Sequence, residues 1–451
     1  MRTEKIKGSL SRGGRLRLAG TGALLTALLA VGGCNILDVT NPNNVIEDAL
    51  QNPTAVQAEV NGSVAQTMQG LLMMYGYIES ASDNIEWVGS LDGMHEINIG
   101  NLRNPFNEFS DDADRAMNPA RWLANQTVER LEAFQAEGQL ADPSQLARAN
   151  LFDAIVYDHI ANFYDDFVIT SDRMEAGPPV GTGNMIVMYD SALTAIDRGL
   201  ALVSSGELRG QLYAMRARTR FDRAVWQKLN PSGQTPADPL VNDPAAAADA
   251  DSALAILGSD YWFQLNQDNG ELGFGNCSFA SCVNSRKEIR FNTDIVSYDY
   301  KNDAITVALE DPIDGVPDPV IEGIVTEFAA AQDRSPITVT SSRAMLLIKA
   351  ENALANSNSA GFSSAINAIR TLDGLTAWSG QVSADSILKY ERHVNLYLQG
   401  RRLNDMYRFG ETSPFWTPES NASQCPGSLF PISKTERATN PNVTEQPACG
   451  Q

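Results

Sequence analysis

The feature that constrains this chain most is the spacing of its apolar side chains. The clearest run consists of Ile186, Tyr189, Leu193, Ile196, Leu200 and Val203, at steps of 3, 4, 3, 4 and 3 residues. Such steps place the side chains on one face of an α-helix. Comparable patterns predict helices at about residues 53–74, 119–137, 144–165, 185–204, 209–229, 341–356, 361–371 and 384–409.

These helices come in pairs with short connections, which is typical of tetratricopeptide-like arrays. No strict repeat period is visible, so the predicted fold is mostly α, with degenerate helix pairs. Residues 230–251 contain four prolines and read as a linker. Residues 76–118 and 258–335 read as long irregular insertions with short strands. Loops of this length are uncommon unless they are functional, so we expect a ligand site there.

The first 33 residues have the pattern of a signal peptide. Residues 1–17 are basic, and an apolar run from Leu18 to Val31 follows that is too short to span a bilayer. The run ends at Val31-Gly32-Gly33-Cys34, which matches the bacterial lipobox, where the cysteine is lipidated. Acyl chains on Cys34 would anchor the protein, and residues 34–52 would form an extended leader. The alternative is ordinary secretory cleavage with a spare cysteine.

The composition excludes several classes of function. There are 34 Lys and Arg against 55 Asp and Glu, and the net charge of −21 argues against nucleic acid as a partner. The three histidines lack metal-site spacing and no nucleotide-binding glycine motif is present, so we predict no cofactor and no metal. Calcium on loop acids remains an alternative, with two candidate clusters: Asp111, Asp112 and Asp114, and Asp311, Asp314 and Asp318.

Four further cysteines follow Cys34. An even number in an exported protein predicts two disulfides among three pairings. Pairing within the two short loops, Cys277 with Cys282 and Cys425 with Cys449, is the one we expect. A metal site with four cysteine ligands is the alternative, and the spacing is poor for zinc.

Several segments, in order, resemble the SusD/RagB family of outer-membrane nutrient-binding lipoproteins. They are Cys34 with Leu37–Asn43, Ala149–Phe167, Ser341–Glu351, Ala365–Arg370, Glu391–Met406, Phe430–Ser433 and Asn440–Asn442. Asn395 and Gln399 stand where the family pattern has glutamates, and residues 258–335 match no family motif. The resemblance implies a SusD-like fold whose two halves cover residues 53–257 and 258–451.

The resemblance also implies a function. Such a protein would be lipid-anchored at the outer membrane and would act as a lid on a TonB-dependent transporter of the SusC type. It would bind a nutrient without chemistry; oligosaccharide is the default ligand and peptide the alternative. Two other classes are an envelope scaffold built of helical repeats and an exported glycan hydrolase.

Aromatic and polar side chains in the two insertions are the candidate ligand contacts. Rings stack on the C–H faces of sugars while a few placed polar groups bond the hydroxyls. We therefore predict a face made by both insertions, with Trp87 and Trp262 as stacking rings; the supporting residues are Tyr75, Tyr77, Asn84, His95 and Tyr261. The alternative is that these rings pack the loops onto helices. Trp122 and Trp226 fall on predicted helices and are expected in the core.

Charged residues on the predicted 384–409 helix have a structural interpretation. Glu391, Arg401 and Asp405 lie among Leu and Tyr, so we expect partly buried ion pairs. A catalytic role would pair Glu391 with Asp405, but on one helix they would lie about 21 Å apart. Glycosidases need their two carboxylates at roughly 5–10 Å, so no catalytic residue is predicted.

Overall fold

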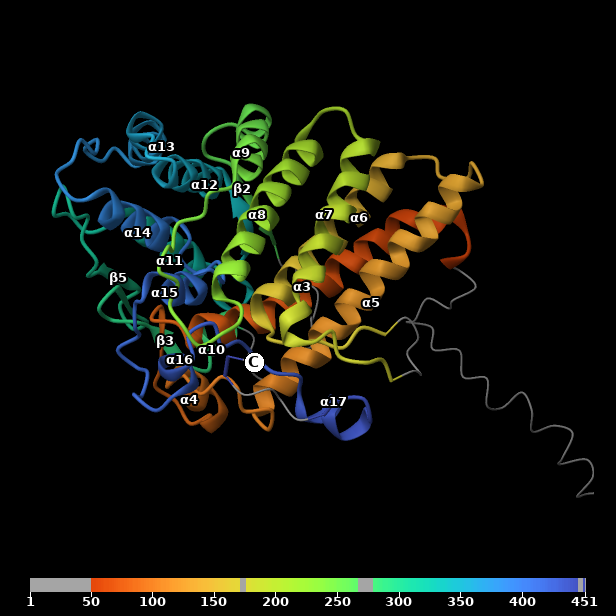
Figure 1. Cartoon of the computed structure of the whole chain (residues 1–451), viewed down its shortest axis with the longest axis horizontal. Helices are drawn as coiled ribbons and strands as arrows, with labels where there is room; N and C mark the ends of the chain where they lie inside the picture. Colours follow the sequence, from red (N-terminus) through yellow and green to blue (C-terminus); the bar gives the residue numbers. More distant parts are fainter. Residues whose placement is uncertain (1–49, 171–175, 267–278, 445–448, 451) are drawn as a thin grey trace, which may run out of the picture. The chain divides into compact units, whose positions relative to one another are not determined.

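The predicted helix pairs form a series in which each long helix packs against the next. The computed structural model describes residues 50–170, 176–266, 279–444 and 449–450. Met1–Asn52 and Pro53–Gln451 form separate units, and every element named here belongs to the second. The series, side by side in Figure 1, is α3 (Val56–Ala81), α5 (Glu108–Ala136), α6 (Pro143–Phe163), α7 (Ile186–Leu202), α8 (Glu207–Leu229), α9 (Pro244–Leu257), α12 (Ser342–Ala355) and α13 (Ser359–Leu372).

Shorter elements fill the spaces between these helices. The short helices are η1 (Pro53–Ala55), α4 (Asp92–Asn98), η2 (Thr182–Asn184), α10 (Phe279–Asn284), α11 (Pro319–Ala330), η3 (Gln332–Arg334), α14 (Ala384–Asn395), α15 (Arg402–Phe409), α16 (Asn421–Gln424) and α17 (Lys434–Thr439). Among the described residues, no helix is both long enough and apolar enough to cross a membrane.

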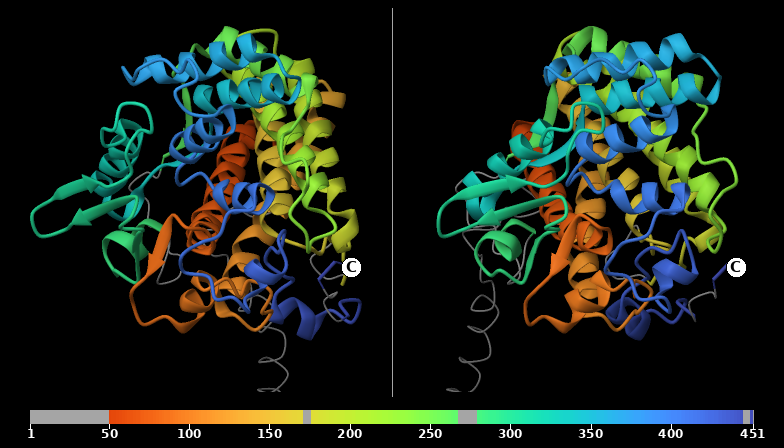
Figure 2. Two further views of the ribbon diagram at one scale, coloured as in Figure 1. Left: turned by 60° about the vertical axis from the view of Figure 1, so that its left-hand side comes forward. Right: turned by 90° about the vertical axis from the view of Figure 1, so that its left-hand side faces the viewer.

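Six short strands form three antiparallel pairs in the described part of the chain. The strands are β1 (Ile85–Trp87), β2 (Trp262–Leu265), β3 (Ile289–Phe291), β4 (Val296–Asp299), β5 (Ala304–Val307) and β6 (Ile337–Ser341). β1 pairs with β3, β2 with β6 and β4 with β5. The teal hairpin of β4 and β5 stands out from the helices in Figure 2. The mostly α fold with helix pairs and short strands is therefore confirmed.

Three helices begin at the same two-residue signal. Asp142, Asp243 and Asp318 cap α6, α9 and α11, and each accepts a backbone N–H two residues further on at 2.9 Å. The proline that follows each aspartate stands at the first helical position, where its missing N–H is not needed. The predicted linker at 230–251 is thus wrong from Pro244 onward, and the predicted insertion at 258–335 contains helix α11.

Two further boundaries differ from the prediction. Helix α3 continues past Gly76 to Ala81. Gly76 lies against α10: a side chain at this position would meet the backbone of Phe279 at 3.2 Å, so glycine allows the two helices to pack closely. The predicted 384–409 helix is broken between Asn395 and Arg402, where Leu398 and Gly400 have positive φ values of 57° and 69°.

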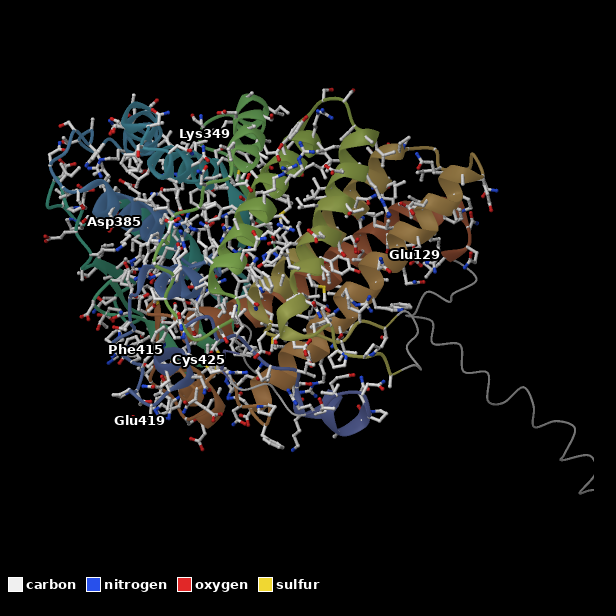
Figure 3. The ribbon with its side chains drawn as sticks, viewed as in Figure 1. Glu129, Lys349, Asp385, Phe415, Glu419 and Cys425 are labelled. Carbon is white, nitrogen blue, oxygen red and sulfur yellow. A yellow bond between two sulfur atoms is a disulfide. The ribbon has the colours of Figure 1, made fainter. Side chains whose placement is uncertain are left out.

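One disulfide closes the C-terminal loop. Cys425, labelled in Figure 3, lies directly after α16 and is bonded to Cys449, with their Cα atoms 5.9 Å apart. This is the expected local pairing. Cys282 is also disulfide-bonded, but Cys277 lies outside the described residues, so its pairing stays a prediction.

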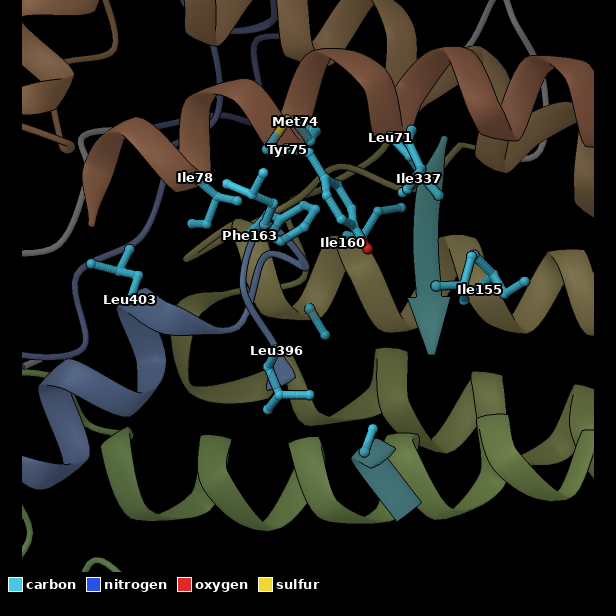
Figure 4. Close-up of a cluster of buried hydrophobic side chains, with 14 of the residues drawn as sticks. Leu71, Met74, Tyr75, Ile78, Ile155, Ile160, Phe163, Ile337, Leu396 and Leu403 are labelled. Atoms are coloured by element: carbon cyan, nitrogen blue, oxygen red, sulfur yellow. The ribbon is translucent and has the colours of Figure 1, made fainter. Parts of the chain in front are cut away.

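The main core joins α3 and α6 to segments far away in the sequence. Figure 4 shows Leu71 and Met74 of α3 facing Ile155 and Phe163 of α6, with Ile337 of β6 between the two helices. All five are almost fully buried. Side chains of about this size contribute roughly 1.5–3 kcal/mol each when buried, so the core fixes the elements from which the loops project.

Candidate functional site

The two predicted insertions meet in space. β1 from the first pairs with β3 from the second, so that Ile85 lies opposite Phe291 and Trp87 opposite Ile289. The carboxylate of Glu288, next to β3, accepts the backbone N–H of Leu91 at 3.2 Å. The structure therefore assembles one surface from chain segments about 200 residues apart.

Trp87 and His95 form an aromatic pair on this surface. Their ring centroids are 4.4 Å apart, with Trp87 half-buried and His95 exposed. Asn98 holds α4 against β1: its Oδ1 accepts the N–H of Trp87 at 3.0 Å, and its Nδ2 donates to the carbonyl of Ile85 at 2.9 Å. The pair thus rests on a fixed backbone.

A groove runs beside this pair, between α4 and the start of α5, and we call it the α4 groove. Its volume is about 460 Å³ and it is lined by Asp92, Gly93, His95, Glu96, Ile99, Asn101, Phe106, Asn107 and Glu108. The amides of Asn104 and Asn107 each donate to Glu96 at 2.9 Å, so its carboxylate is held in place. The groove combines aromatic edges with fixed polar groups and lies in the size range of small-ligand sites, about 300–1,000 Å³.

The two insertions also carry exposed apolar side chains. Phe106 is 72% exposed, more than any other large apolar side chain in the described part of the chain. Val88 and Val316, both 42% exposed, come from the same two insertions. Phe106 therefore offers an apolar ring to a molecule that enters the α4 groove.

Three predicted contacts lie in the core. Tyr75 and Tyr77 are each 1% exposed, and the Tyr75 hydroxyl hydrogen-bonds with His159 at 3.1 Å. Asn84 is buried as well, and donates to Glu79 at 2.6 Å. Tyr77 is buried because α3 extends beyond the predicted end that would have placed this residue in a loop. Tyr75 reaches only a small cavity, of about 40 Å³, whose lining it shares with Trp262.

Tyr261 and Trp262 are held at another place. The Tyr261 hydroxyl donates to Glu207 of α8 at 2.5 Å, and the Arg343 guanidinium lies 5.7 Å from the Trp262 ring centre. Trp262 lines a cavity of only about 40 Å³. Neither Trp87 nor Trp262 lines the α4 groove, so the two rings do not face each other across it.

Glu391, Arg401 and Asp405 lie in buried ion pairs. The pairs are Glu391 with Arg370 at 2.9 Å, Arg401 with Asp222, and Asp405 with Arg392 at 2.9 Å and Arg408 at 2.8 Å. Burial raises the pKa of Glu391 to about 7. Burial opposes ionisation of Asp405 too, but Arg392 and Arg408 hold its pKa far below the ordinary value. Because the predicted helix is broken, the 21 Å separation of Glu391 and Asp405 no longer applies. Both carboxylates are instead engaged in ion pairs with arginines, as expected for a structural role.

The two aspartate clusters are engaged by protein groups. Asp111 accepts the N–H of Thr435 at 2.9 Å, Asp311 pairs with Arg370 at 2.7 Å, and Asp318 caps α11. In the described ranges, no group of three or more His, Cys, Asp and Glu is placed to hold a metal ion.

Two residues of interest escaped the sequence interpretation. Phe106 stands alone in the polar stretch Asn104-Pro105-Phe106-Asn107, and an apolar ring with no helical partner could have marked it. Trp122 was expected in the core, which is wrong: it is half-buried and lines a second groove. Trp226 is half-buried too, against the main core.

Solved structures share the fold of this chain. A SusD superfamily protein from Bacteroides fragilis matches with a TM-score of 0.61 and 13% identity, over 87% of this chain and 99% of that chain. The chain has the SusD-like fold. A SusD homolog from Bacteroides thetaiotaomicron matches with a TM-score of 0.59 and 13% identity, over 89% and 99% of the two chains.

A third similar structure has a name that states what it binds. It is a SusD-like carbohydrate-binding protein from Bacteroides vulgatus, with a TM-score of 0.54 and 12% identity over 87% of this chain and 97% of that one. No protein-family model matches the chain, and no curated protein matches it by sequence. The resemblance noted in the sequence is thus confirmed at the level of the fold.

Proposed function

We propose that this protein is a lipid-anchored binding protein that captures an oligosaccharide for a SusC-like, TonB-dependent transporter of the outer membrane. The observation that carries the proposal is the SusD-like fold, which extends over 87% of this chain and 99% of a SusD superfamily protein. A neighbour with the same fold is described as carbohydrate-binding.

The α4 groove is the proposed capture site. Phe106 and His95 line this groove and offer ring surface for the C–H faces of a sugar, and Trp87 packs against His95 from outside the lining. Glu96 and Asn101 offer an acceptor and an amide for the sugar hydroxyls. Glu96 is already held by two amides, so little side-chain freedom is lost when a ligand binds. Binding of this kind needs no bond to form or break.

Attachment to the membrane is proposed through Cys34. The preceding basic segment, apolar run and Val31-Gly32-Gly33 make the pattern that lipoprotein processing requires. Several acyl chains together give stable anchoring, at about 0.8 kcal/mol per buried CH₂. A protein so tethered can remain over a transporter while its binding surface faces outward.

Calorimetry of the mature protein tests the capture site. The probes are neutral oligosaccharides of glucose, xylose, mannose and galactose, with a peptide mixture as the second arm. Stacked rings contribute about 1–3 kcal/mol each, by analogy with bases on aromatics. Trp87→Ala and Phe106→Ala should therefore weaken binding by about 5- to 150-fold.

The matched control is Val187→Ala, an exposed apolar residue on α7 that is 43% accessible and lies outside the groove. It should leave the affinity unchanged. Binding of peptides alone would replace oligosaccharide as the ligand class. Binding of neither, or the release of shortened oligosaccharides, would contradict the proposal in favour of a scaffold or a hydrolase.

A further inference from the structure

The α4 groove carries acidic side chains and lacks basic ones. Its described lining residues include three carboxylates, those of Asp92, Glu96 and Glu108, and no lysine or arginine. Asp92 and Glu108 are exposed, so their charges face a molecule that approaches from solution. The lining also includes the imidazole of His95, and its protonation would still leave the groove net negative. The charge of the groove therefore bears on which ligand it accepts.

The arginines that follow these acids closely in the sequence are engaged elsewhere. Arg103 pairs with Asp165, with 3.5 Å between Nε and Oδ2, and Arg115 pairs with Asp112. In the described part of the chain, none of the three groove carboxylates pairs with a lysine or an arginine. The negative charge of the groove is thus not cancelled by the protein.

The carboxylate of Glu96 is fixed in place by neutral groups. The amide of Asn104 donates to both of its oxygens at 2.9 Å, and the amide of Asn107 donates to Oε2 at 2.9 Å. Glu96 lies in the last turn of α4 (Asp92–Asn98), where the helix dipole opposes a negative charge. Two amides therefore hold this acid in an unfavourable position without neutralising it, which leaves its charge to a ligand.

The carboxylates are not arranged as a metal site. In the ranges that the structure describes, no group of three or more His, Cys, Asp and Glu is placed to hold a metal ion. The acids instead line a groove of about 460 Å³ together with the exposed rings of Phe106 and His95. A ligand that carries positive charge on units with C–H faces matches this lining better than a bare ion.

We propose that the α4 groove selects a positively charged amino sugar, an oligosaccharide whose units carry an ammonium group in place of one hydroxyl. The inference rests on the proposed function for saccharide binding at this groove, and it adds the charge of the ligand. An ammonium group donates charge-assisted hydrogen bonds to carboxylates, which are roughly twice as strong as neutral ones. Sugars with carboxylate or sulfate groups would meet like charges and be repelled.

Calorimetry of the mature protein with matched pairs of trimers tests this selection. The pairs are glucose with glucosamine and galactose with galactosamine in the same linkage, so that the members differ only by ammonium for hydroxyl. At about pH 6 the ammonium group keeps its proton. The amino sugar of at least one pair should then bind about 5- to 15-fold more tightly than its neutral partner. Raising the salt concentration should reduce this ratio, because salt screens exposed charges.

Neutral variants of the acids show whether the groove carries the selection. The double variant Asp92→Asn with Glu108→Gln removes two exposed charges, and it should lower the ratio by about 2- to 5-fold with little change in the affinity for the neutral sugar. Glu96→Gln should lower the ratio as well, but it also disturbs the amide hydrogen bonds, so the exposed pair is the decisive variant. Glu129→Gln is the matched control, because this exposed glutamate of α5 lies outside the groove; it should leave the ratio unchanged.

Three results would overturn the amino-sugar selection and leave the proposed function standing. The first is equal binding of both members of every pair while a neutral oligosaccharide binds. The second is a ratio that the double variant does not change. The third is binding of trilysine as tight as that of the amino sugar, which would show that the groove recognises any cationic chain, including a basic peptide. Binding of no amino sugar and no neutral oligosaccharide would overturn both.

Discussion

Replacing Arg370 by methionine should destabilise the fold more than any exposed charge change. The Arg370 side chain is fully buried at the end of α13. It donates to Asp311 at 2.7 and 3.0 Å, to Glu391 of α14 at 2.9 Å, and to the carbonyl of Thr376 at 2.5 Å. Methionine keeps the length and the apolar stem, so that the charge and its hydrogen bonds are what is lost.

The magnitude follows from what remains behind. Asp311 is 1% and Glu391 2% exposed, so both carboxylates would be buried without their cation. Removing one partner of a buried ion pair typically costs about 3–5 kcal/mol. Protonation of Glu391, whose pKa burial already raises to about 7, offsets part of this loss in acid. We therefore expect a loss of about 3–5 kcal/mol at pH 8 and a smaller one at pH 5, out of a total of roughly 5–15 kcal/mol for a typical domain.

Urea unfolding followed by circular dichroism measures the loss. The control is Arg198→Met, because Arg198 and its partner Glu132 are 54% and 42% exposed and 3.2 Å apart. Exposed pairs contribute about 0–1 kcal/mol. If Arg370→Met loses no more than Arg198→Met, or if its loss is equal at pH 5 and pH 8, the reasoning about a buried charge is wrong.

Three further outcomes are expected. First, burial raises the pKa of five carboxyls to about 7, namely Glu79, Asp114, Asp153, Asp158 and Glu391, and it lowers the pKa of His159 and His393. Between pH 4.5 and 6.5 the folded state keeps the protons of five carboxyls and lacks those of two histidines, so it holds more protons than the unfolded state. Calorimetry should therefore show the melting temperature falling as pH rises through this window, and a rise would contradict these burials. Second, Cys425→Ser should cost about 3 kcal/mol in urea unfolding, because the bond closes a loop with a sequence separation of 24; no change would mean that the bond leaves the unfolded chain unconstrained. Third, Cys34→Ala should move the mature protein from the membrane to the soluble fraction on cell fractionation; retention at the membrane would refute lipid anchoring at this residue.

Helices α9 and α11 show what the sequence interpretation missed and why. Both begin at an Asp-Pro pair, and their apolar residues recur at helical steps: Ala246, Ala250 and Ala253 in α9, and Ile321, Val325 and Phe328 in α11. Prolines and alanines made these stretches resemble a linker and a loop. Asp-Pro alone is not sufficient, since Asp311-Pro312 starts no helix. The pair and the spacing together would have found both helices.

The break after α14 could not be found locally. Gly400 gives its N–H to Glu79 at 2.6 Å, and a side chain at this position would meet the Phe163 ring at 3.1 Å. Its partners lie more than 200 residues away in the sequence, and the apolar spacing of residues 384–409 is that of one helix. Likewise, the pairing of β1 with β3 is a long-range contact. The sequence predicted that the insertions form one face and named Trp87 and His95 for it, but it also named the buried Tyr75 and Tyr77 and missed Phe106.

The division between core and groove explains how a shared fold can persist at about 13% identity. Apolar residues of about the right size at helical spacing are enough to form a core, and buried pairs such as Arg370 with Glu391 fix how the helices meet. The α4 groove depends on neither: Asn98 anchors its backbone, and Phe106 and His95 project into solvent. Substitutions of these two side chains should therefore cost little stability, so the proposed ligand site can vary while the fold is kept. Substitutions of the buried arginines should destabilise the fold itself.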